Sequence, residues 1–284
     1  MSSIIQDKEF KDLNEMTVTE LEAQLAKSNR AVIPVGSSEQ HGPHLPLGTD
    51  WWSAVGLGRE VARKMEALFV PNVPYGVSPY HCPWVGDITL STDTLVAVFM
   101  DICKSLYRDG IREVVVIIGH EGNIIPVKLA VDEAQRQYRG MRFIIAEAYR
   151  VVHNLFDIPL HHANVQELTQ VLFYDPDYVC DSSLYTNSSD KDVADSEHER
   201  YRRNDIYPVL ADFTEIAPSG YYGDVDQPTK EEVAERLDKA SDEIIEFAEE
   251  FFEHVKTGFA YGAPENKEVV EKATNINKEA VYTL

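Results

Sequence analysis

Short β-prone runs alternate with segments of helical periodicity along most of this chain, and no other feature restricts its fold as strongly. The clearest run spans residues 113–118 and consists largely of valine and isoleucine, and apolar residues at helical spacing follow it. Strands that alternate with helices form βαβ units, in which parallel strands are covered by helices on both faces. The sequence therefore predicts an α/β fold built on a mainly parallel sheet.

The expected elements follow from the apolar spacing and from the breaks between periodic segments. We predict strands over residues 31–35, 69–73, 113–118 and 142–148, and helices over residues 51–68, 95–108, 124–138, 164–173 and 229–255. The acidic face of the last helix should be solvated, and residues 175–207 should form a polar excursion on the surface. Residues 1–256 would then form one domain, followed by a tail, residues 257–284, that is either loose or laid on a neighbouring subunit.

The charge of the chain argues against several classes of partner. Lysine and arginine total 26 against 48 aspartates and glutamates, so the formal charge is −22, which repels phosphate backbones and anionic membranes. No apolar run approaches the roughly 20 residues of a spanning helix, and the first residues do not have the pattern of a secretion signal. Three widely spaced cysteines fit reduced thiols. We expect a cytoplasmic protein that binds neither nucleic acid nor membranes.

The most informative segment is residues 34–50, which read P-V-G-S-S-E-Q-H-G-P-H-L-P-L-G-T-D. Its prolines and glycines shape a stiff loop that contains Glu39, His41, His44 and Asp50. Glu39 and His41 are two residues apart, so both point the same way in an extended stretch. A carboxylate with an imidazole is a common ligand pair for zinc, manganese or iron. The alternative is a loop of capping and turn residues with one buried histidine.

Two further polar segments are placed where they could join this loop. Residues 119–123, G-H-E-G-N, come directly after a predicted strand, and their backbone N–H groups at the following helix start could face an anion. His162 and Glu167 are five residues apart, beyond the spacing that stacks two side chains on one helix face. We expect Glu167 to hold metal and His162 to reach a substrate. Ligands of parallel sheets collect at the carboxyl ends of the strands, so these segments can share one crevice.

These segments resemble the signature motifs of the creatininase, or creatinine amidohydrolase, family. Residues 34–50 are similar to the first signature over nearly their whole length, and residues 119–123 are similar to its N-G-H-G-G-N motif. Residues 75–81 resemble its Y-G-x-S-x-x-H loop, residues 162–167 its H-A-G-E-x-E-T-S motif, and residues 219–224 its S-G-x-x-G-D turn. Together the similar segments lie within residues 14–255.

The resemblance implies a three-layer α/β/α sandwich and a hydrolase with two divalent metal ions, which would be zinc, manganese or iron. Carried over by position, Glu39, Asp50 and His120 would hold one ion. His41, Glu167 and the shared Asp50 would hold the other. Two neighbouring cations can share a water molecule and lower its pKa, so the nucleophile would be a metal-bound hydroxide. The resemblance also implies a homo-oligomer, namely a hexamer.

Departures from the family pattern bear on the substrate. True creatininases take a metal-binding glutamate from two positions past the strand-end histidine, where this chain has Gly122, so the carboxylate should come from Glu167. Arg150 and Ile158 stand at the positions of the two tryptophans that clamp creatinine, which argues against creatinine as the substrate. Asn164 also replaces a glycine of the pattern.

The catalytic and substrate-binding residues are inferred from the same motifs. His162 matches the proton-transferring histidine of the family, and the alternative for it is a capping or core histidine. We predict five substrate contacts: Tyr80, His81, Trp84, Arg150 and Tyr221. The aromatic residues among them could equally pack in the core or in an interface, and Arg150 could form a surface ion pair.

The sequence thus predicts a metal-dependent hydrolase of a small cyclic or amide-like compound, such as a cyclic amide, a formamide or a keto-inositol ring. Within the family, the alternative is C–C bond hydrolysis of a diketo-inositol, as in inositol catabolism. Outside it, the alternative is a non-catalytic binding protein with a structural metal. Structural zinc sites favour closed sets of cysteine and histidine, whereas the ligands here are rich in carboxylates. The ligand chemistry therefore favours the enzyme.

Overall fold

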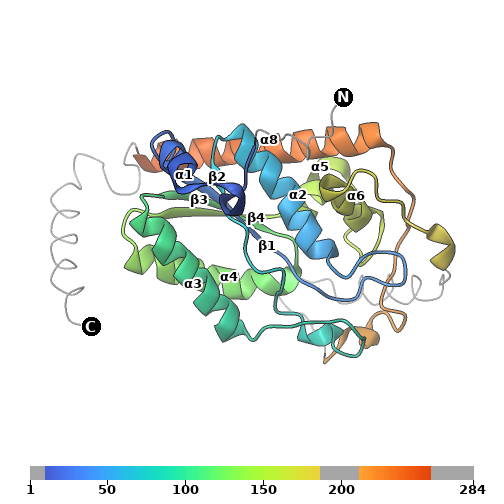
Figure 1. Ribbon diagram of the computed structural model, residues 1–284. Helices are drawn as coiled ribbons and strands as arrows, with labels where there is room; N and C mark the ends of the chain where they lie inside the picture. Colours follow the sequence, from blue (N-terminus) through green and yellow to red (C-terminus); the bar gives the residue numbers. More distant parts are fainter. Residues whose placement is uncertain (1–9, 186–210, 257–284) are drawn as a thin grey trace. The chain divides into compact units, whose positions relative to one another are not determined.

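The structure is a computed structural model that describes residues 10–185 and 211–256 (Figure 1). In these residues, four parallel strands form one sheet in the order β2 (Leu68–Phe69), β1 (Arg30–Val35), β3 (Glu113–Ile118) and β4 (Arg142–Glu147). The central strands β1 and β3 end together, because Val35 pairs with Ile118. The loops that follow these two strands therefore begin side by side.

Helices cover both faces of the sheet. One face packs against α3 (Thr92–Arg108) and α4 (Ile124–Gln137), and the other against α2 (Thr49–Lys64), which contacts α6 (Val165–Tyr174). The other described helices are α1 (Val18–Leu25), α5 (Ala148–Phe156) and α8 (Lys230–Lys256), and the short 3-10 turns are η2 (Leu13–Glu15), η3 (Pro79–His81), η4 (Glu121–Asn123), η5 (Ser182–Leu184) and η6 (Phe213–Glu215). This is a three-layer α/β/α sandwich, and the expected fold class is confirmed. None of the helices in the described ranges is long and apolar enough to cross a membrane.

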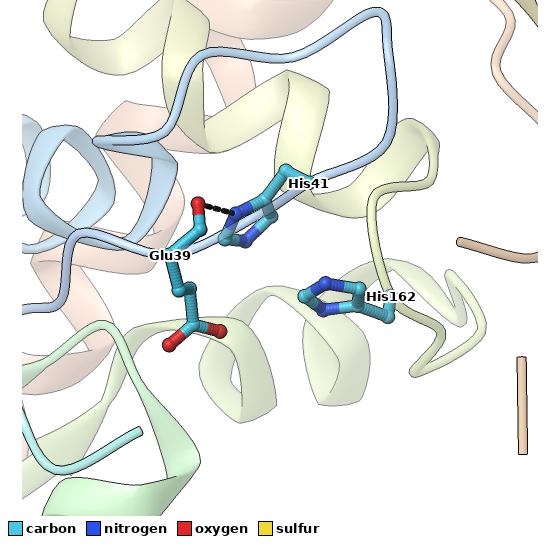
Figure 2. A group of neighbouring side chains, drawn as sticks. All are labelled: Glu39, His41 and His162. Carbon is cyan, nitrogen blue, oxygen red and sulfur yellow. Dashed lines mark hydrogen bonds between the residues drawn. The ribbon is translucent and has the colours of Figure 1, made fainter. Parts of the chain in front are cut away.

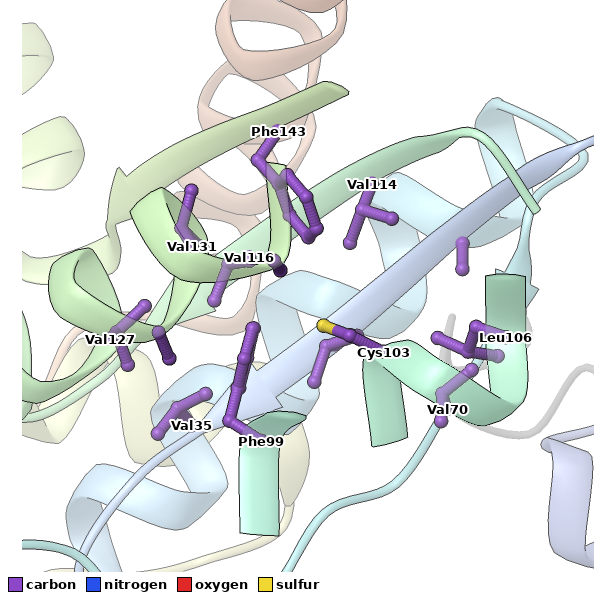
Figure 3. Packing of buried hydrophobic residues seen from close by; sticks show 14 of the residues in the cluster. Val35, Val70, Phe99, Cys103, Leu106, Val114, Val116, Val127, Val131 and Phe143 are labelled. Carbon is purple, nitrogen blue, oxygen red and sulfur yellow. The ribbon is translucent and has the colours of Figure 1, made fainter. Parts of the chain in front are cut away.

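A large hydrophobic cluster lies between the sheet and the α3–α4 layer (Figure 3). Val114 and Val116 of β3 point into it and pack with Phe99 of α3 and Val127 of α4. Ile117 points to the opposite face, where Gly58 of α2 lies within contact distance. Because β3 is buried on both faces, its sequence is a continuous apolar run with no alternation.

Most predicted elements agree with the structure. The strand over residues 113–118 has the predicted ends, and the other predicted helices and strands, apart from β2, shift by at most four residues at either end. The prediction of a strand over residues 69–73 is wrong in length. Val70 still donates its N–H to Val32 at 2.9 Å, and the pairing ends there, one residue before Pro71, whose ring restricts the backbone. Helices α1 and α5 have no counterpart in the sequence prediction.

The chain divides into two compact units, Met1–Ile244 and Ile245–Leu284. The predicted surface excursion is described only as far as residue 185, and the remainder of it, together with the tail of residues 257–284, lies outside the described residues. In α8, the expected solvated face is confirmed for the acidic residues of the first unit. They are Glu231, Glu232, Glu235, Asp242 and Glu243, and all of them are exposed.

Candidate metal centre

The predicted ligands come from four places at one edge of the sheet. Glu39 and His41 lie in the loop after β1, and His120 follows β3 after a single glycine. Asp50 lies in the first turn of α2 and Glu167 in the first turn of α6. The parallel order of β1 and β3 therefore explains why segments far apart in the sequence meet here.

Two glycines allow the first turn of α2 to approach the strand ends. A Cβ atom added at Gly36 would lie 2.4 Å from the Cα of Trp51, and one added at Gly119 would lie 2.0 Å from the carbonyl oxygen of Asp50. Both neighbours are backbone atoms, which cannot move aside as a flexible side chain could. The absence of a side chain at these positions sets where the Asp50 carboxylate sits.

We expect Gly119→Ala to displace Asp50, because its methyl group would overlap the Asp50 carbonyl oxygen. The variant should lose about 1–3 kcal/mol of unfolding free energy, as overpacked sites do, and should retain less divalent metal. Denaturant unfolding and elemental analysis would measure both effects. Gly48→Ala is the control, since its Cβ would lie 3.5 Å from the nearest atom, on Trp52. Normal stability and metal content in Gly119→Ala would contradict this account.

Asp50 faces a different histidine with each of its two carboxylate oxygens. Oδ1 lies 3.2 Å from Nε2 of His41, and Oδ2 lies 3.0 Å from Nδ1 of His120. The same His120 nitrogen lies 3.1 Å from Oε2 of Glu39, and His41 Nε2 lies 3.6 Å from Oε2 of Glu167. The side chains thus form two groups that share Asp50. Within each, the ligand atoms lie within 4.8 Å of one another: Glu39, Asp50 and His120 in one, and His41, Asp50 and Glu167 in the other.

The atoms that face one another in these groups suit a divalent cation. Oε2 of Glu39, Nε2 of His41 and Oδ2 of Asp50 are buried and have no partner in hydrogen-bond geometry among the residues that the structure describes. Nδ1 of His41 lies 3.2 Å from the carbonyl oxygen of Glu39, to which it can donate (Figure 2), so Nε2 is the nitrogen aimed at the carboxylates. Oxygen and imidazole nitrogen ligands without thiolates suit zinc, manganese or iron.

The electrostatics of the centre also favour a cation. Burial raises the pKa of Glu167 to about 7 in spite of the nearby His41. Burial alone would lower the pKa of His41, but the carboxylates of Asp50 and Glu167 raise it to about 10. In spite of burial, the facing carboxylates likewise raise the pKa of His120 well above its usual value. The imidazoles of His41 and His120 therefore hold protons among the carboxylates of Glu39, Asp50 and Glu167. A divalent cation bound by the same atoms would replace those protons and balance the same charge.

His162 is held beside the centre by groups other than the predicted ligands. Its Nε2 lies 3.0 Å from the carbonyl oxygen of Gln40, its Nδ1 lies 3.8 Å from Oε1 of Glu167, and its ring centroid lies 4.4 Å from that of His41 (Figure 2). Burial and the neighbouring His41 and His81 put its pKa well below the usual value. Glu39, His41 and His162 also satisfy the geometric criterion for a metal site, an arrangement that the sequence did not predict.

The segment before α6 holds Glu167 and His162 in place. Asn164 caps the helix, because its side chain accepts from the N–H groups of Gln166 and Glu167. The residue before it, Ala163, has a positive φ of 58°. Its carbonyl oxygen lies 2.7 Å from Nε2 of His44, and its N–H donates to Glu167. The asparagine that departs from the family pattern thus serves as the helix cap.

The predicted substrate contacts do not all lie together. Tyr80, His81 and Trp84 gather around the centre, with the His81 ring centroid 5.2 Å from Tyr80 and 6.3 Å from Trp84. Arg150 is half exposed and forms ion pairs with Glu147 and Glu121, which is the alternative to a substrate contact that the sequence left open. Tyr221 is buried and packs edge-on against His44 with centroids 5.2 Å apart.

The structure also adds residues that the sequence analysis did not select. Phe213 packs on the rings of His81 and His162, with centroid distances of 4.8 and 4.7 Å, and no sequence signal marked it. Gln40 lies inside the first motif but carries no titratable group, so acid–base chemistry does not mark it as a candidate. The suggestion that the start of the helix after β3 faces an anion does not hold for Asn123. Its N–H donates to the His120 carbonyl, and its side chain joins Gly36 to Val77.

Comparison with known proteins shows the family to which the chain belongs. A family model described as creatininase, creatinine amidohydrolase, matches residues 14–248. The chain belongs to the creatininase family. A solved creatinine amidohydrolase (creatininase) superposes with a TM-score of 0.69 at 22% identity, covering 84% of this chain and 97% of that one. Other solved relatives include one named creatininase Mn and one of Zn-Zn type.

Relatives of this creatininase-family chain differ in their named activities. A creatinine amidohydrolase of Pseudomonas putida is 29% identical over 214 residues, or 69% of this chain and 81% of that protein. A mycofactocin precursor peptide peptidase of Mycobacterium ulcerans is 34% identical over 117 residues, or 38% of this chain and 46% of the peptidase. A 3-dehydro-scyllo-inosose hydrolase of Thermotoga maritima is 23% identical over 175 residues, or 58% and 56%. The chain thus spans about half the length of the peptidase and inosose hydrolase relatives.

Proposed function

We propose that this protein is a dinuclear metal-dependent hydrolase that cleaves an amide C–N bond in a small compound. The observation that carries the proposal is the position of Asp50, which presents one oxygen to each of the two ligand groups. A carboxylate that offers one oxygen to each of two neighbouring cations can bridge them. The names of two relatives, an amidohydrolase and a peptidase, have amide cleavage in common.

The chain's own residues have distinct roles in this proposal. Glu39, Asp50 and His120 would hold one divalent ion, and His41 and Glu167 would hold the other together with Asp50. Such ions activate water and polarise a carbonyl group. Glu39, His41, Asp50 and His120 are almost fully buried, which strengthens the electrostatic interactions among them.

His162 would transfer the proton that the departing nitrogen needs. Its Nε2 is engaged by Gln40, so Nδ1, which faces Glu167, is the nitrogen left for proton exchange. The low pKa of this imidazole keeps the ring neutral near neutral pH, so it would first take a proton from the attacking water and, once protonated, readily give it to the departing nitrogen. The rings of Trp84 and Phe213 lie near His81 and would line the apolar side of the substrate pocket.

The direct experiment is elemental analysis of the purified protein combined with a hydrolysis screen over cyclic amides, formamides, short peptides and inososes. We expect retained divalent metal and turnover of at least one amide class, lost with a chelator and restored by zinc, manganese or iron. Protein without divalent metal and without turnover would refute the proposal. Metal and ligand binding without turnover would favour the binding-protein alternative.

The name of the inosose hydrolase relative supports a second candidate function, which is the hydrolysis of a keto-inositol ring. Water would then break a C–C bond next to a carbonyl group, which the same ions could polarise. Turnover of inososes without turnover of any amide would favour this second candidate.

We also propose that the chain forms a homo-oligomer, with a hexamer expected from the family. Closed symmetric assemblies are the usual state of soluble homo-oligomers. Sedimentation should give a species larger than a monomer at micromolar concentration, and a monomer would contradict the proposal. Deleting residues 257–284 tests their suggested role as an arm, because an unchanged assembly would remove that role and leave the oligomer in place.

A further inference from the structure

We propose that Gln40 is a positioning residue that aims the Glu39 carboxylate at its cation by way of His81. The inference rests on the metal centre of the proposed function. Gln40 lies between the ligands Glu39 and His41 and is only 4% exposed. Its side-chain amide contacts two imidazoles, those of His81 and His162, and none of the predicted metal ligands.

One hydrogen bond determines which way the Gln40 amide points. The N–H of Gly42 donates to Oε1 of Gln40 at 3.0 Å. In the flipped orientation the amide NH₂ group would face this N–H, and two donors would oppose each other. The backbone at Gly220 closes the same end, because a Cβ atom there would lie 2.3 Å from Oε1. The NH₂ group of Gln40 therefore faces the imidazoles.

The orientation of the amide sets the tautomer of His81. Nε2 of Gln40 lies 3.0 Å from Nδ1 of His81, so Nδ1 must accept a hydrogen bond and carries no proton. The proton of the neutral ring then lies on Nε2, which is 3.2 Å from Oε1 of Glu39 and would donate to it in the proposed arrangement.

The result is a relay in which each group has one defined role. Gly42 donates to Gln40, Gln40 donates to His81, and His81 donates to Oε1 of Glu39. The other oxygen of Glu39, Oε2, is left facing His120 at 3.1 Å, where the cation would bind. His81, predicted to bind the substrate, would instead orient a metal ligand. Partners of this kind fix the direction in which a ligand offers its lone pair.

The test replaces Gln40 and measures both the tautomer of His81 and the affinity for zinc. Gln40→Met removes the amide at similar volume. Gln40→Glu keeps the acceptor for the Gly42 N–H but has no hydrogen to donate. Two-bond ¹H–¹⁵N spectra of the histidine rings report the tautomer, with a His81→Asn variant to assign the signal. Competition with a chelator reports the dissociation constant for Zn²⁺. Gln170→Met is the control, since this buried glutamine bonds to Ser53 and Gln166.

We expect wild-type His81 to carry its proton on Nε2, and both Gln40 variants to lose that pattern. Zn²⁺ should bind about 10- to 100-fold more weakly in both variants, the usual cost of losing an outer partner of a ligand, and normally in Gln170→Met. If Gln40→Met does not fold, Gln40→Glu decides the outcome. A proton on Nδ1 of wild-type His81, or wild-type zinc affinity in the folded Gln40 variants, would overturn the inference. Wild-type protein that binds no zinc would instead refute the proposed function, while the spectrum of His81 still tests the relay.

Discussion

Asp50→Ala should remove divalent metal from both ligand groups at once and reduce hydrolysis to background. Asp50 supplies one carboxylate oxygen to the ligand group that contains His41 and the other to the ligand group that contains His120, so neither ligand group is complete without it. The loss of affinity should exceed the roughly 10- to 100-fold that removal of an outer partner costs. Elemental analysis after dialysis and turnover of the best substrate would measure the effect.

Two further variants define what the Asp50 result means. His41→Ala should empty mainly one site, because Glu39, Asp50 and His120 remain. Asp93→Ala changes another aspartate in the first turn of a helix, one that is exposed, and should retain both ions. If Asp50→Ala loses no more metal than His41→Ala, Asp50 does not bridge the two sites.

His162→Ala should lower turnover by roughly 10²- to 10⁴-fold, the scale of losing a positioned acid or base, and leave the metal content unchanged. The contact between Nε2 of His162 and Gln40 makes this nitrogen unavailable as a ligand. Glu167→Ala should lower both turnover and metal content, since its carboxylate belongs to one of the ligand groups. Single-turnover kinetics together with elemental analysis would separate the two effects.

His153→Ala provides the comparison for His162→Ala. His153 lies in α5, where its Nδ1 contacts the carbonyl oxygen of Ile158, and its loss should leave turnover unchanged. Loss of metal in His162→Ala would mean that the group formed by Glu39, His41 and His162 binds an ion. His162 would then be a ligand, and the acid or base would have to be sought elsewhere.

The sequence predicted the centre of the fold better than its edges. Strand β3 has the predicted ends, because burial on both faces gives an apolar run that nothing else in the chain resembles. Helix α1 buries none of its residues, so it has little apolar periodicity, although the capping box of Thr17 and Glu20 does mark its start. Helix α5 begins directly where β4 ends, and no turn residue separates them.

In the site, too, the spacing of motifs along the sequence predicts the positions of some residues and not of others. The five predicted ligands lie together, because their motifs follow parallel strand ends or open helices. The prediction for Arg150 rests on its neighbouring residues and that for Tyr221 on a cluster of aromatic residues, and side chains on an exposed helix turn or behind a loop can point in several directions. The role of Gln40 depends on an amide orientation, which only the position of the Gly42 N–H determines.

Because α2 approaches the strand ends so closely, the glycines at this contact are under a different evolutionary constraint from the metal ligands. Gly36 and Gly119 have no side chain because backbone atoms of Trp51 and Asp50 occupy that space, whatever ion or substrate is bound. Glu39, His41 and His120 are required only while metal is used. A descendant that had abandoned catalysis could therefore exchange its histidines and carboxylates yet would still need both glycines. Retention of the glycines without the ligands would identify a degenerate copy of this fold, and it would distinguish inherited architecture from retained chemistry.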